Sequence, residues 1–391
     1  MNNRIWPKRL FALDVSRGLA ALGVVLWHWQ HFAYNTGIGA IDSSFDRTQQ
    51  PLYAIFRLFY EEGEKGVGYF FVLSGFIFFW LYKDAIKSKR VNLGRFWVQR
   101  FSRLYPLHFL TLLLVALLQL IYIANSGDSW VYPLNDTYHF FLNLFSVHAW
   151  GLSRDWSFNG PTWTVSAEIF LYIVFFWVAR VRLGNVMFCL LVSFLAAVGS
   201  LISEGDFITG PTPILQGLSA FFLGGVVYYI TDYISQKSVS LKPAVHSVAI
   251  ATIVLTLINF YIFDIGAVLL STFGPLGDIF LTVFPNYILF PSLIASLTLA
   301  EIDSSPKIKQ WLSEISWIGD ITYSSYLLHF PLQMLCALAV SYGVLNADFY
   351  LSAIALIAFF TVLVPLSYAT FIRFERPAQK LIRNQLKTYV G

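Results

Sequence analysis

The stretch LFALDVSRGLAALGVVLWHWQHF, residues 10–32, indicates a membrane fold, because it is long and apolar enough to cross a bilayer yet carries ionisable side chains, among them Asp14, Arg17 and His28. A transmembrane helix needs about 20 mostly apolar residues to cross about 30 Å of hydrocarbon. Asp14, Arg17 and His28 interrupt the run, and no small-residue cleavage site follows it, which disfavours a cleaved signal peptide. We therefore expect residues 10–32 to form a first membrane-spanning helix.

The composition outside this stretch is also that of a membrane protein. Of 391 residues, 57% are hydrophobic and 12% are charged, and the mean hydropathy is +0.63. A soluble domain carries about 25% charged residues. The net charge of +4 is small and scattered, so we expect no nucleic-acid partner. The two cysteines, Cys189 and Cys336, lie in apolar stretches, so we expect neither disulfides nor a metal site.

Ten segments are long and apolar enough to be membrane spans. They are residues 10–32, 65–82, 103–123, 163–181, 184–203, 213–233, 243–263, 279–300, 317–343 and 349–372. The apolar segment 137–150 is too short and polar to cross, and we expect it to lie along the membrane surface. The sequence thus predicts an all-α polytopic membrane protein of about ten transmembrane helices. We expect one membrane-embedded domain over residues 1–391 with no fused soluble domain.

The distribution of basic residues supports this number of spans. If the N-terminus is cytoplasmic, 21 of the 26 lysines and arginines fall in cytoplasmic segments. Only Arg47, Arg57, Lys65 and Arg154 fall outside, and Arg17 lies within the first span. This asymmetry is the positive-inside pattern, so we place both termini in the cytoplasm.

Ionisable side chains within the spans mark a candidate site, because such groups are costly in a bilayer. Arg17 and His28 are eleven positions apart, which is nearly three helical turns, so they share one face at a separation of about 16 Å. Asp14 lies one turn before Arg17 and is expected to pair with it. This arrangement suits a long donor, with a phosphate at Arg17 and an extended arm that carries a thioester to His28. A buried ion pair beside a hydrogen-bonded histidine explains the same residues without a function.

Glu168, about two turns into the fourth span, has no basic residue near it on its own helix. Its predicted depth is that of His28, so we expect these two side chains to pair. Arg95, Arg100 and Arg103 cluster in RFWVQRFSRLYP, residues 95–106, just before the third span. Guanidinium groups bind phosphates bidentately, so this cluster predicts a phosphate clamp at the cytoplasmic mouth, although it also fits simple orientation by positive charge.

Two further segments carry polar residues at membrane depth. The stretch GVGYFFVLSGF, residues 66–76, contains glycines and Ser74, which allow close helix approach. The stretch YSSYLLHFPL, residues 323–332, contains Tyr323 and His329, and His329 is either a functional group or a satisfied core histidine.

Taken together, these residues resemble the integral-membrane acyltransferase-3 family, which modifies bacterial surface glycans and some small molecules. The most specific element is LDVSRGLAALGVVLWHW, residues 13–29, in which ten residues separate Arg17 from His28. FFVLSGF, RFSRLYP, the spacing from Trp163 to Glu168, SYLLHFP and the FERP of residues 374–377 follow in the family's order. The match covers essentially the whole chain.

The resemblance implies an acyl-CoA donor, usually acetyl-CoA, that is reached from the cytoplasm of a bacterial inner-membrane protein. It implies a carbohydrate hydroxyl as acceptor, free or lipid-linked, and no permanently bound cofactor. It also implies that Arg17 and His28 matter for activity. We therefore expect His28 to act as general base with Glu168 in support, while Arg17, Arg100 and Arg103 hold the CoA phosphates.

Several alternatives stay open at this point. Ser74 or Tyr323 can donate to the oxyanion, and the acyl group can pass directly to the acceptor or through an acyl-His28 intermediate. A proton-coupled carrier of sugars or lipid-linked glycans is the rival class, because buried Asp, Arg, His and Glu also suit transport. A carrier built from repeats should show related motifs in its two halves, and the sequence shows none. Neither the acceptor nor the identity of the short acyl group can be read from the residues.

Overall fold

The computed structural model describes residues 6–37, 39–203, 207–237 and 239–386, and within these ranges it is helical with no β-strand. The helices are α1 (Phe11–Trp27), α2 (Tyr53–Glu62), α3 (Gly66–Leu81), α4 (Lys83–Lys87), α5 (Leu93–Ser126), α6 (Thr137–Leu144), α7 (Trp163–Arg180), α8 (Val186–Ile202), α9 (Thr212–Lys237), α10 (Lys242–Tyr261), α11 (Ile265–Phe273), α12 (Pro275–Phe284), α13 (Phe290–Asp303), α14 (Pro306–Ile315), α15 (Trp317–Asp320), α16 (Thr322–Ser341), α17 (Ala353–Thr370) and α18 (Arg376–Leu386). The prediction of an all-α fold is confirmed.

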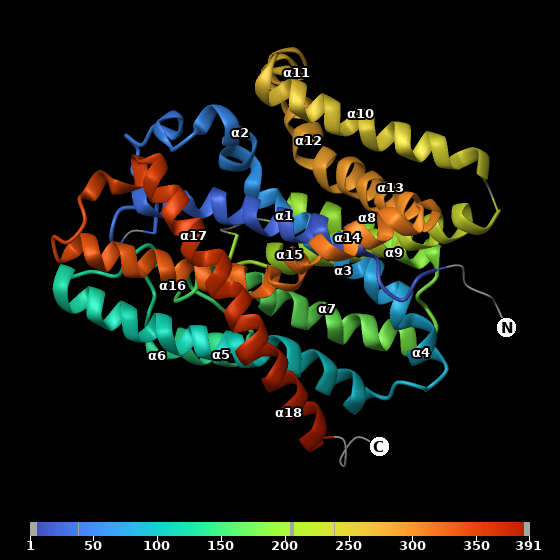
Figure 1. The fold of residues 1–391 in the computed structure, drawn as a ribbon, viewed down its shortest axis with the longest axis horizontal. Coiled ribbons are helices and arrows are strands. Elements are labelled where there is room, and N and C mark those ends of the chain that lie inside the picture. Colours follow the sequence, from blue (N-terminus) through green and yellow to red (C-terminus); the bar gives the residue numbers. More distant parts are fainter. Residues whose placement is uncertain (1–5, 38, 204–206, 238, 387–391) are drawn as a thin grey trace.

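Nine helical segments of the described chain are long and apolar enough to cross a membrane. The remaining predicted span, residues 184–203, corresponds to α8, which is apolar but has only 17 residues, at the short end of the range for a crossing helix. In Figure 1, α1, α5, α7 and α16 run along the long axis of the molecule. The protein is therefore a multi-pass membrane protein. The side on which its termini lie stays a prediction from the charge pattern.

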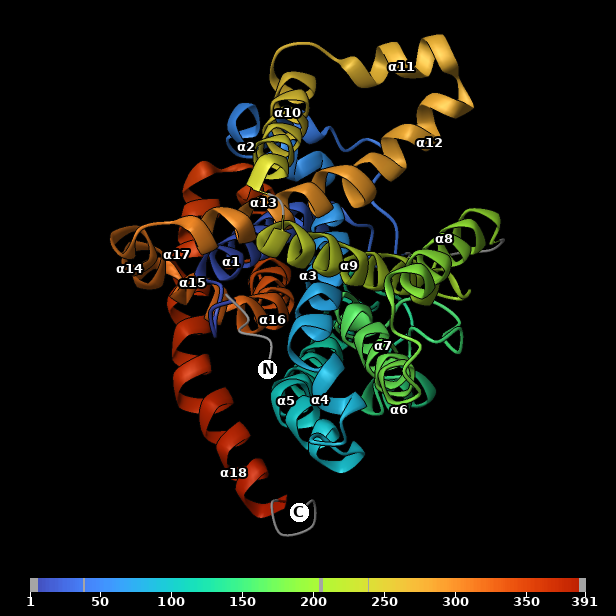
Figure 2. The same ribbon diagram turned by 90° about the vertical axis from the view of Figure 1, so that its right-hand side faces the viewer.

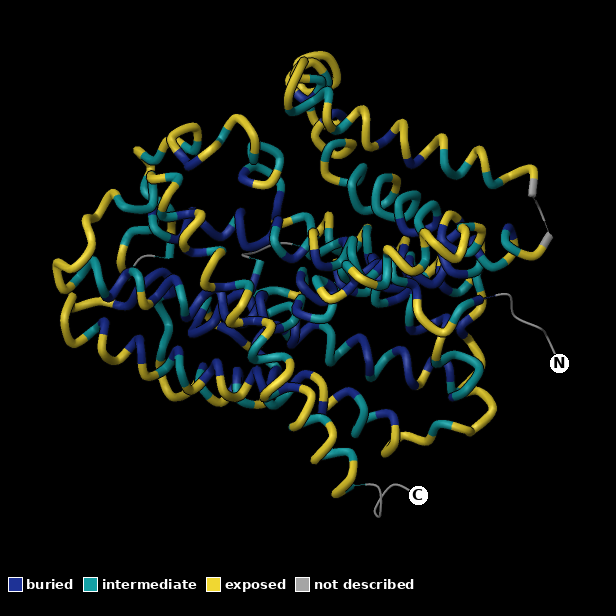
Figure 3. Tube along the Cα trace, viewed as in Figure 1, coloured by how far each residue is buried: buried dark blue, intermediate teal, exposed yellow. Residues whose placement is uncertain are grey.

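Burial separates the central helices from those that face lipid. Figure 2, turned by 90° from Figure 1, shows α1, α3 and α16 at the centre, with α10, α11 and α12 standing out on one side. In the apolar stretch of α16 that is long enough to cross a membrane, 67% of the residues are buried, whereas in the corresponding stretch of α10 only 11% are buried. Figure 3 shows the same contrast along the trace. Since exposed apolar surface on a spanning helix faces hydrocarbon, α10 is a peripheral, lipid-facing helix.

The third predicted span is longer than expected at its N-terminal end. Helix α5 begins at Leu93 rather than at residue 103, and the Asn92 side chain accepts a hydrogen bond from the Arg95 amide at 2.8 Å, which caps the helix. Pro106 lies inside α5 without ending it. The arginine cluster therefore lies on the helix, not in the connection before it, and Arg100 and Arg103 are one turn apart.

Other helix boundaries also differ from the predicted ones. The second span, predicted at 65–82, is continued toward the N-terminus by α2 through a 3₁₀ turn at Gly63–Lys65. The last span continues through a π-turn at Phe371–Glu375 into α18. In the segment 137–150 the only α-helix is α6, whose eight residues are too few to cross a bilayer.

The glycines of the second span allow close helix packing, as predicted. A Cβ atom at Gly75 on α3 would lie 1.8 Å from the Phe221 carbonyl oxygen on α9. A Cβ atom at Gly224 on α9 would lie 2.0 Å from the Val72 carbonyl oxygen on α3. Two facing glycines thus bring the backbones of α3 and α9 into contact, which fixes one wall of the central helix group.

Candidate active site

A cavity of about 450 Å³ lies among α1, α3, α5, α7, α16 and α18, within the size range of small-molecule sites. It brings together seven of the nine residues predicted from the sequence, namely Asp14, Arg17, Ser74, Arg100, Arg103, Glu168 and Tyr323. His28 and His329 do not line it. Six basic and four acidic side chains line the cavity, so its walls carry an excess of positive charge when all are ionised.

A second, larger cavity of about 870 Å³ lies on another side of α1, between α2, α10, α12 and α13. Its lining is mostly apolar, and it contains none of the predicted site residues. The smaller, charged cavity is therefore the candidate active site.

Arg17 is tied to the far end of the sequence. Its Nη2 donates a hydrogen bond to the Gly319 carbonyl at 2.7 Å and lies 3.2 Å from Asp14 Oδ1, which confirms the predicted Asp14–Arg17 pair. The glycine is needed because a Cβ at position 319 would lie 2.2 Å from the Asp14 carbonyl oxygen. The Arg17 Nε is buried and has no hydrogen-bond partner.

Arg9 forms a second set of ion pairs beside Arg17, which the sequence did not predict. Arg9 Nε lies 2.5 Å from Asp14 Oδ2, and Arg9 Nη2 donates to Asp320 Oδ1 at 2.9 Å. Partial burial by itself lowers the pKa of Arg9, but the hydrogen bonds and charges of Asp14 and Asp320 outweigh it and raise that pKa. Asp14 is thus shared by two arginines, which leaves Arg17 only partly neutralised.

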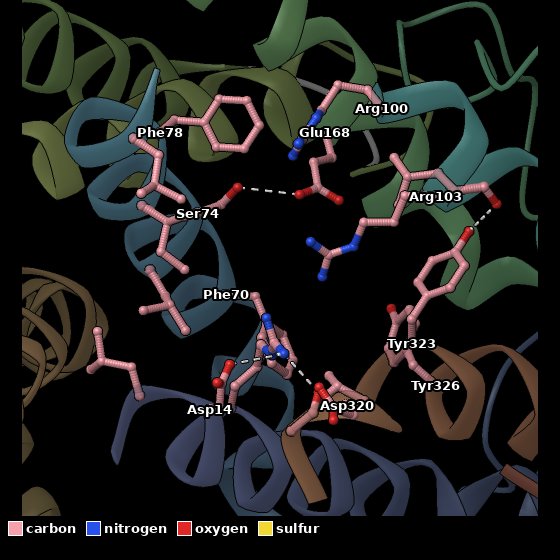
Figure 4. A pocket seen from close by; sticks show the side chains of 18 of the residues that line it. Asp14, Phe70, Ser74, Phe78, Arg100, Arg103, Glu168, Asp320, Tyr323 and Tyr326 are labelled. Carbon is pink, nitrogen blue, oxygen red and sulfur yellow. Dashed lines mark hydrogen bonds and ion pairs between the residues drawn. The ribbon is translucent and has the colours of Figure 1, made fainter. Parts of the chain in front are cut away.

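Arg103 is the least paired arginine of the cavity. It makes no hydrogen bond and no close ion pair with any residue that the structure describes. Figure 4 shows its guanidinium group projecting into the cavity between Glu168 and Asp14. Arg100, one turn earlier, is instead held in place. Its Nη2 donates to the Tyr82 hydroxyl at 2.5 Å and its guanidinium lies over the Phe78 ring.

Sequence reasoning missed some of the lining residues. Arg383 on α18 donates to Ser102 Oγ at 3.0 Å and so joins the arginine group from the C-terminal end of the chain. It lies seven residues, or about two helical turns, after Arg376 of the FERP motif, a spacing that could have indicated a shared helix face. Glu375 is buried, accepts a hydrogen bond from Ser324 and also lines the cavity.

Glu168 lies in the cavity but does not pair with His28. Its Oε1 accepts hydrogen bonds from Ser74 Oγ at 3.2 Å and from the Tyr172 hydroxyl. The predicted His28–Glu168 hydrogen bond is therefore absent, because Glu168 finds its partners on α3 and on its own helix one turn later. The hydroxyl of Ser74 is engaged by this carboxylate, and that of Tyr323 donates to the Leu104 carbonyl at 2.5 Å.

His28 belongs to a separate buried cluster at the end of α1, where the α-helix changes to a 3₁₀ turn. The ring centroids of His31 and His329 each lie 4.8 Å from that of His28. Gln333 Nε2 donates to the His28 carbonyl at 3.0 Å, and Gln333 Oε1 lies 3.0 Å from His31 Nδ1. The Tyr132 hydroxyl lies 3.1 Å from His31 Nε2. His31, Gln333 and Tyr132 were not predicted, although the short spacing from His28 to His31 is visible in the sequence.

One residue joins the cluster to the cavity. Tyr326 lines the cavity, and its carbonyl oxygen lies 2.6 Å from His329 Nδ1. The two ring centroids are 5.8 Å apart. The basic cavity and the histidine cluster are therefore adjacent, with α16 contributing to both. Among the described residues there is no group of three His, Cys, Asp or Glu side chains arranged to hold a metal ion.

Comparison with known proteins finds relatives that match part of the chain. The chain is 30% identical over 127 residues to a protein named acyltransferase MdmB from Streptomyces mycarofaciens, a match that covers 31% of this chain and 30% of that protein. It is 33% identical over 110 residues to protein 2 in the picA locus of Rhizobium radiobacter, covering 28% of this chain and 46% of that protein. The matched segments thus span less than half of either relative. No solved structure matches the chain.

The family assignment covers much more of the sequence than either relative. The profile of the acyltransferase 3 family, described as an acyltransferase domain, matches residues 10–372. This range includes α1 with Arg17 and His28, the arginines of α5, Glu168 on α7 and His329 on α16. The chain belongs to the acyltransferase 3 family.

Proposed function

We propose that this protein is a membrane-bound O-acyltransferase that moves a short acyl group, such as acetyl, from acyl-CoA to a carbohydrate hydroxyl. The single observation that carries the donor assignment is Arg103, an arginine inside a membrane-embedded cavity that has no hydrogen-bond or close ion-pair partner among the described residues. A charge at membrane depth is costly unless a partner or ligand compensates it. The carboxylates of Glu168 and Glu375 act on this charge only from beyond ion-pair distance, and an anionic ligand can meet it directly.

The chemistry of the cavity favours a phosphate-bearing donor. Arg17, Arg100, Arg103 and Arg383 reach the cavity from three different helices. Guanidinium groups match phosphate oxygens bidentately, and the free Nε of Arg17 adds a further donor. We place the CoA phosphates among these arginines, at the end of the cavity where Lys8 and Arg9 enter its lining, and the pantetheine arm toward Tyr326.

The acyl transfer itself is assigned to the histidine cluster. In our proposal His28 removes the proton of the acceptor hydroxyl, and the oxygen attacks the thioester carbonyl carbon. The carbon–sulfur bond breaks, CoA leaves as the thiolate, and the proton passes from His28 to that thiolate. A neutral imidazole suits this role because it offers a nitrogen lone pair that can accept the hydroxyl proton. The acceptor is proposed to be a glycan, free or lipid-linked, and the membrane a bacterial inner membrane with the donor on the cytoplasmic side.

The test uses the full-length protein in lipid with acetyl-CoA labelled in the acetyl group. Free CoA and label on protein and on candidate glycans are followed for wild type, His28→Ala and Arg17→Ala. We expect CoA release with label on a glycan in wild type, its loss in His28→Ala, and a weaker donor affinity in Arg17→Ala. If label stays on the wild-type protein and is lost in His28→Ala, the acyl group passes through an acyl-histidine intermediate and not directly to the acceptor. Absence of both CoA binding and acetyl consumption in wild type would overturn the proposal in favour of a carrier.

A further inference from the structure

We propose that His329 is the positioning residue for His28 during acyl transfer, the role that the sequence had assigned to Glu168. A histidine base needs its second ring nitrogen held by an acceptor, which fixes the tautomer and stabilises the imidazolium that forms. This inference rests on the proposed function and identifies the side chain that holds the second ring nitrogen of the general base.

The unpartnered nitrogens of the cluster point to this pair. His28 Nδ1 and His329 Nε2 are both buried and have no hydrogen-bond partner. The two imidazole rings lie with centroids 4.8 Å apart and planes inclined by 27°. Histidine χ2 is a broad torsion, so the His28 ring can turn in place to bring its Nδ1 toward His329 Nε2 while His329 keeps its contact with the Tyr326 carbonyl. Buried polar atoms without partners are rare in native proteins and call for an explanation.

The tautomer of His329 is suited to receive a hydrogen bond. Its Nδ1 lies 2.6 Å from the Tyr326 carbonyl oxygen, which can only accept, so Nδ1 carries the proton. A neutral ring with a proton on Nδ1 has a lone pair on Nε2. When His28 takes the acceptor's proton on its own Nε2, its Nδ1–H can donate to His329 Nε2. The resulting chain runs from the acceptor hydroxyl through His28 and His329 to the Tyr326 carbonyl.

The other neighbours of His28 cannot fill this role. Both ring nitrogens of His31 are engaged, because Gln333 donates its amide to the His28 carbonyl and must therefore present its oxygen to His31 Nδ1. His31 Nε2 is then left to accept from the Tyr132 hydroxyl. Glu168 is hydrogen bonded to Ser74 and lies outside the cluster. Among the described rings that contact His28, only His329 offers a free acceptor, and the Val24 carbonyl, one turn earlier on α1, lies outside hydrogen-bond geometry.

The test compares two amide substitutions that imitate different ring nitrogens. His329→Asn keeps a donor near the position of Nδ1 for the Tyr326 carbonyl and removes the acceptor at Nε2. His329→Gln extends an amide oxygen to the position of Nε2 and gives up the Nδ1 bond. If His329 positions His28, the Gln variant is more active than the Asn variant. If His329 is only a structural core residue, the order is reversed.

We expect kcat to fall about 10- to 100-fold in His329→Asn, the factor that one hydrogen bond to a charged group contributes. We also expect the acid limb of the kcat/KM profile to move to lower pH, which a purely structural change does not cause. Acyl-CoA binding should be unchanged in both variants, because His329 does not line the donor cavity, and retained binding shows that each variant is folded.

His108 provides a matched control. It is buried, its Nε2 lies 2.8 Å from the Asn143 carbonyl oxygen, and its Nδ1 has no partner. His108→Gln and His108→Asn should leave kcat within about twofold of wild type. If the wild type transfers acyl groups and His329→Asn is at least as active as His329→Gln, this inference alone is overturned. Absence of transfer in wild type would instead overturn the proposed function.

Discussion

The guanidinium group of Arg17 on α1 donates a 2.7 Å hydrogen bond to the backbone carbonyl of Gly319 on α15, 302 residues later in the chain. The contact exists because Gly319 lets the two backbones touch: a Cβ there would lie 2.2 Å from the Asp14 carbonyl oxygen. Arg17, in the first predicted span, is thus oriented by the C-terminal third of the protein. Asp14, Arg17 and Gly319 all line the charged cavity, so its shape depends on this junction.

A methyl group at position 319 should loosen that junction. Gly319→Ala must push α15 away from α1, and such overpacking typically costs about 1–3 kcal/mol of stability. We expect a lower melting temperature and a weaker affinity for acyl-CoA, both measurable on protein in lipid. Gly199→Ala on α8 is the control, because its Cβ would meet only the flexible Leu215 side chain at 3.4 Å. Equal behaviour of the two variants would contradict the structural role of Gly319.

Arg103 should account for a large part of donor affinity. Removing one charge-assisted hydrogen bond costs about 1.5–3 kcal/mol, so Arg103→Gln should raise the KM for acyl-CoA about 10- to 100-fold. Because the guanidinium has no hydrogen-bonded partner among the described residues, we expect little change in thermal stability. Arg95→Gln, on the same helix but exposed and outside the cavity, should leave KM unchanged. An unchanged KM in Arg103→Gln would place the CoA phosphates elsewhere.

His28 should affect turnover rather than donor binding. A general base typically contributes 10²- to 10⁴-fold to the rate, so we expect His28→Ala to lower kcat by about that factor. Because His28 does not line the donor cavity, calorimetric titration with acyl-CoA should give the wild-type affinity. A variant that loses CoA binding together with turnover would show that the histidine cluster and the cavity form one binding site.

His28 and Glu168 should act independently of each other. Glu168 is hydrogen bonded to Ser74 and Tyr172, and shares no partner with His28. The free-energy costs of His28→Ala and Glu168→Gln should therefore add in the double variant to within about 0.5 kcal/mol. The measurement is kcat/KM for the four proteins of the cycle. If kcat/KM of the double variant were no lower than that of His28→Ala, the result would support the catalytic pair of His28 and Glu168 that was predicted from the sequence.

His148, in the connection between α6 and α7, should make stability fall in acid. Burial, followed by the charge of His108, lowers the pKa of His148 to about 3. In the unfolded chain this pKa is about 6.5, so as the pH falls the unfolded state binds the proton first. Folding stability should then decrease by about 1.4 kcal/mol per pH unit between about pH 6.5 and pH 3. Melting temperatures of His148→Gln and wild type should diverge over this range, with the variant less pH-dependent. Parallel curves would mean that His148 is not buried in its neutral form.

The class of fold and most of the predicted residues that line the charged cavity could be recognised from the sequence alone. Ten apolar segments and the excess of basic residues on one side were enough for a polytopic helical protein, because hydrocarbon admits no unpaired backbone and each span must be a helix of predictable length. Asp14 and Arg17 were recognisable because a charge in a span needs a reason, and Arg100 and Arg103 because clustered arginines beside a span can bind phosphate. Those properties are local, so they can be read along the chain.

Only the tertiary structure decided which of these groups meet. Glu168 was paired with His28 from its depth alone, but rotation about the helix axis turns it toward Ser74 on α3. His329 reaches His28 because α16 packs against the end of α1, and Arg383 joins the cavity because α18 packs along α5. Depth follows from position in the sequence, whereas the direction in which a side chain faces its neighbours follows from how glycines such as Gly75 and Gly319 let the helices pack.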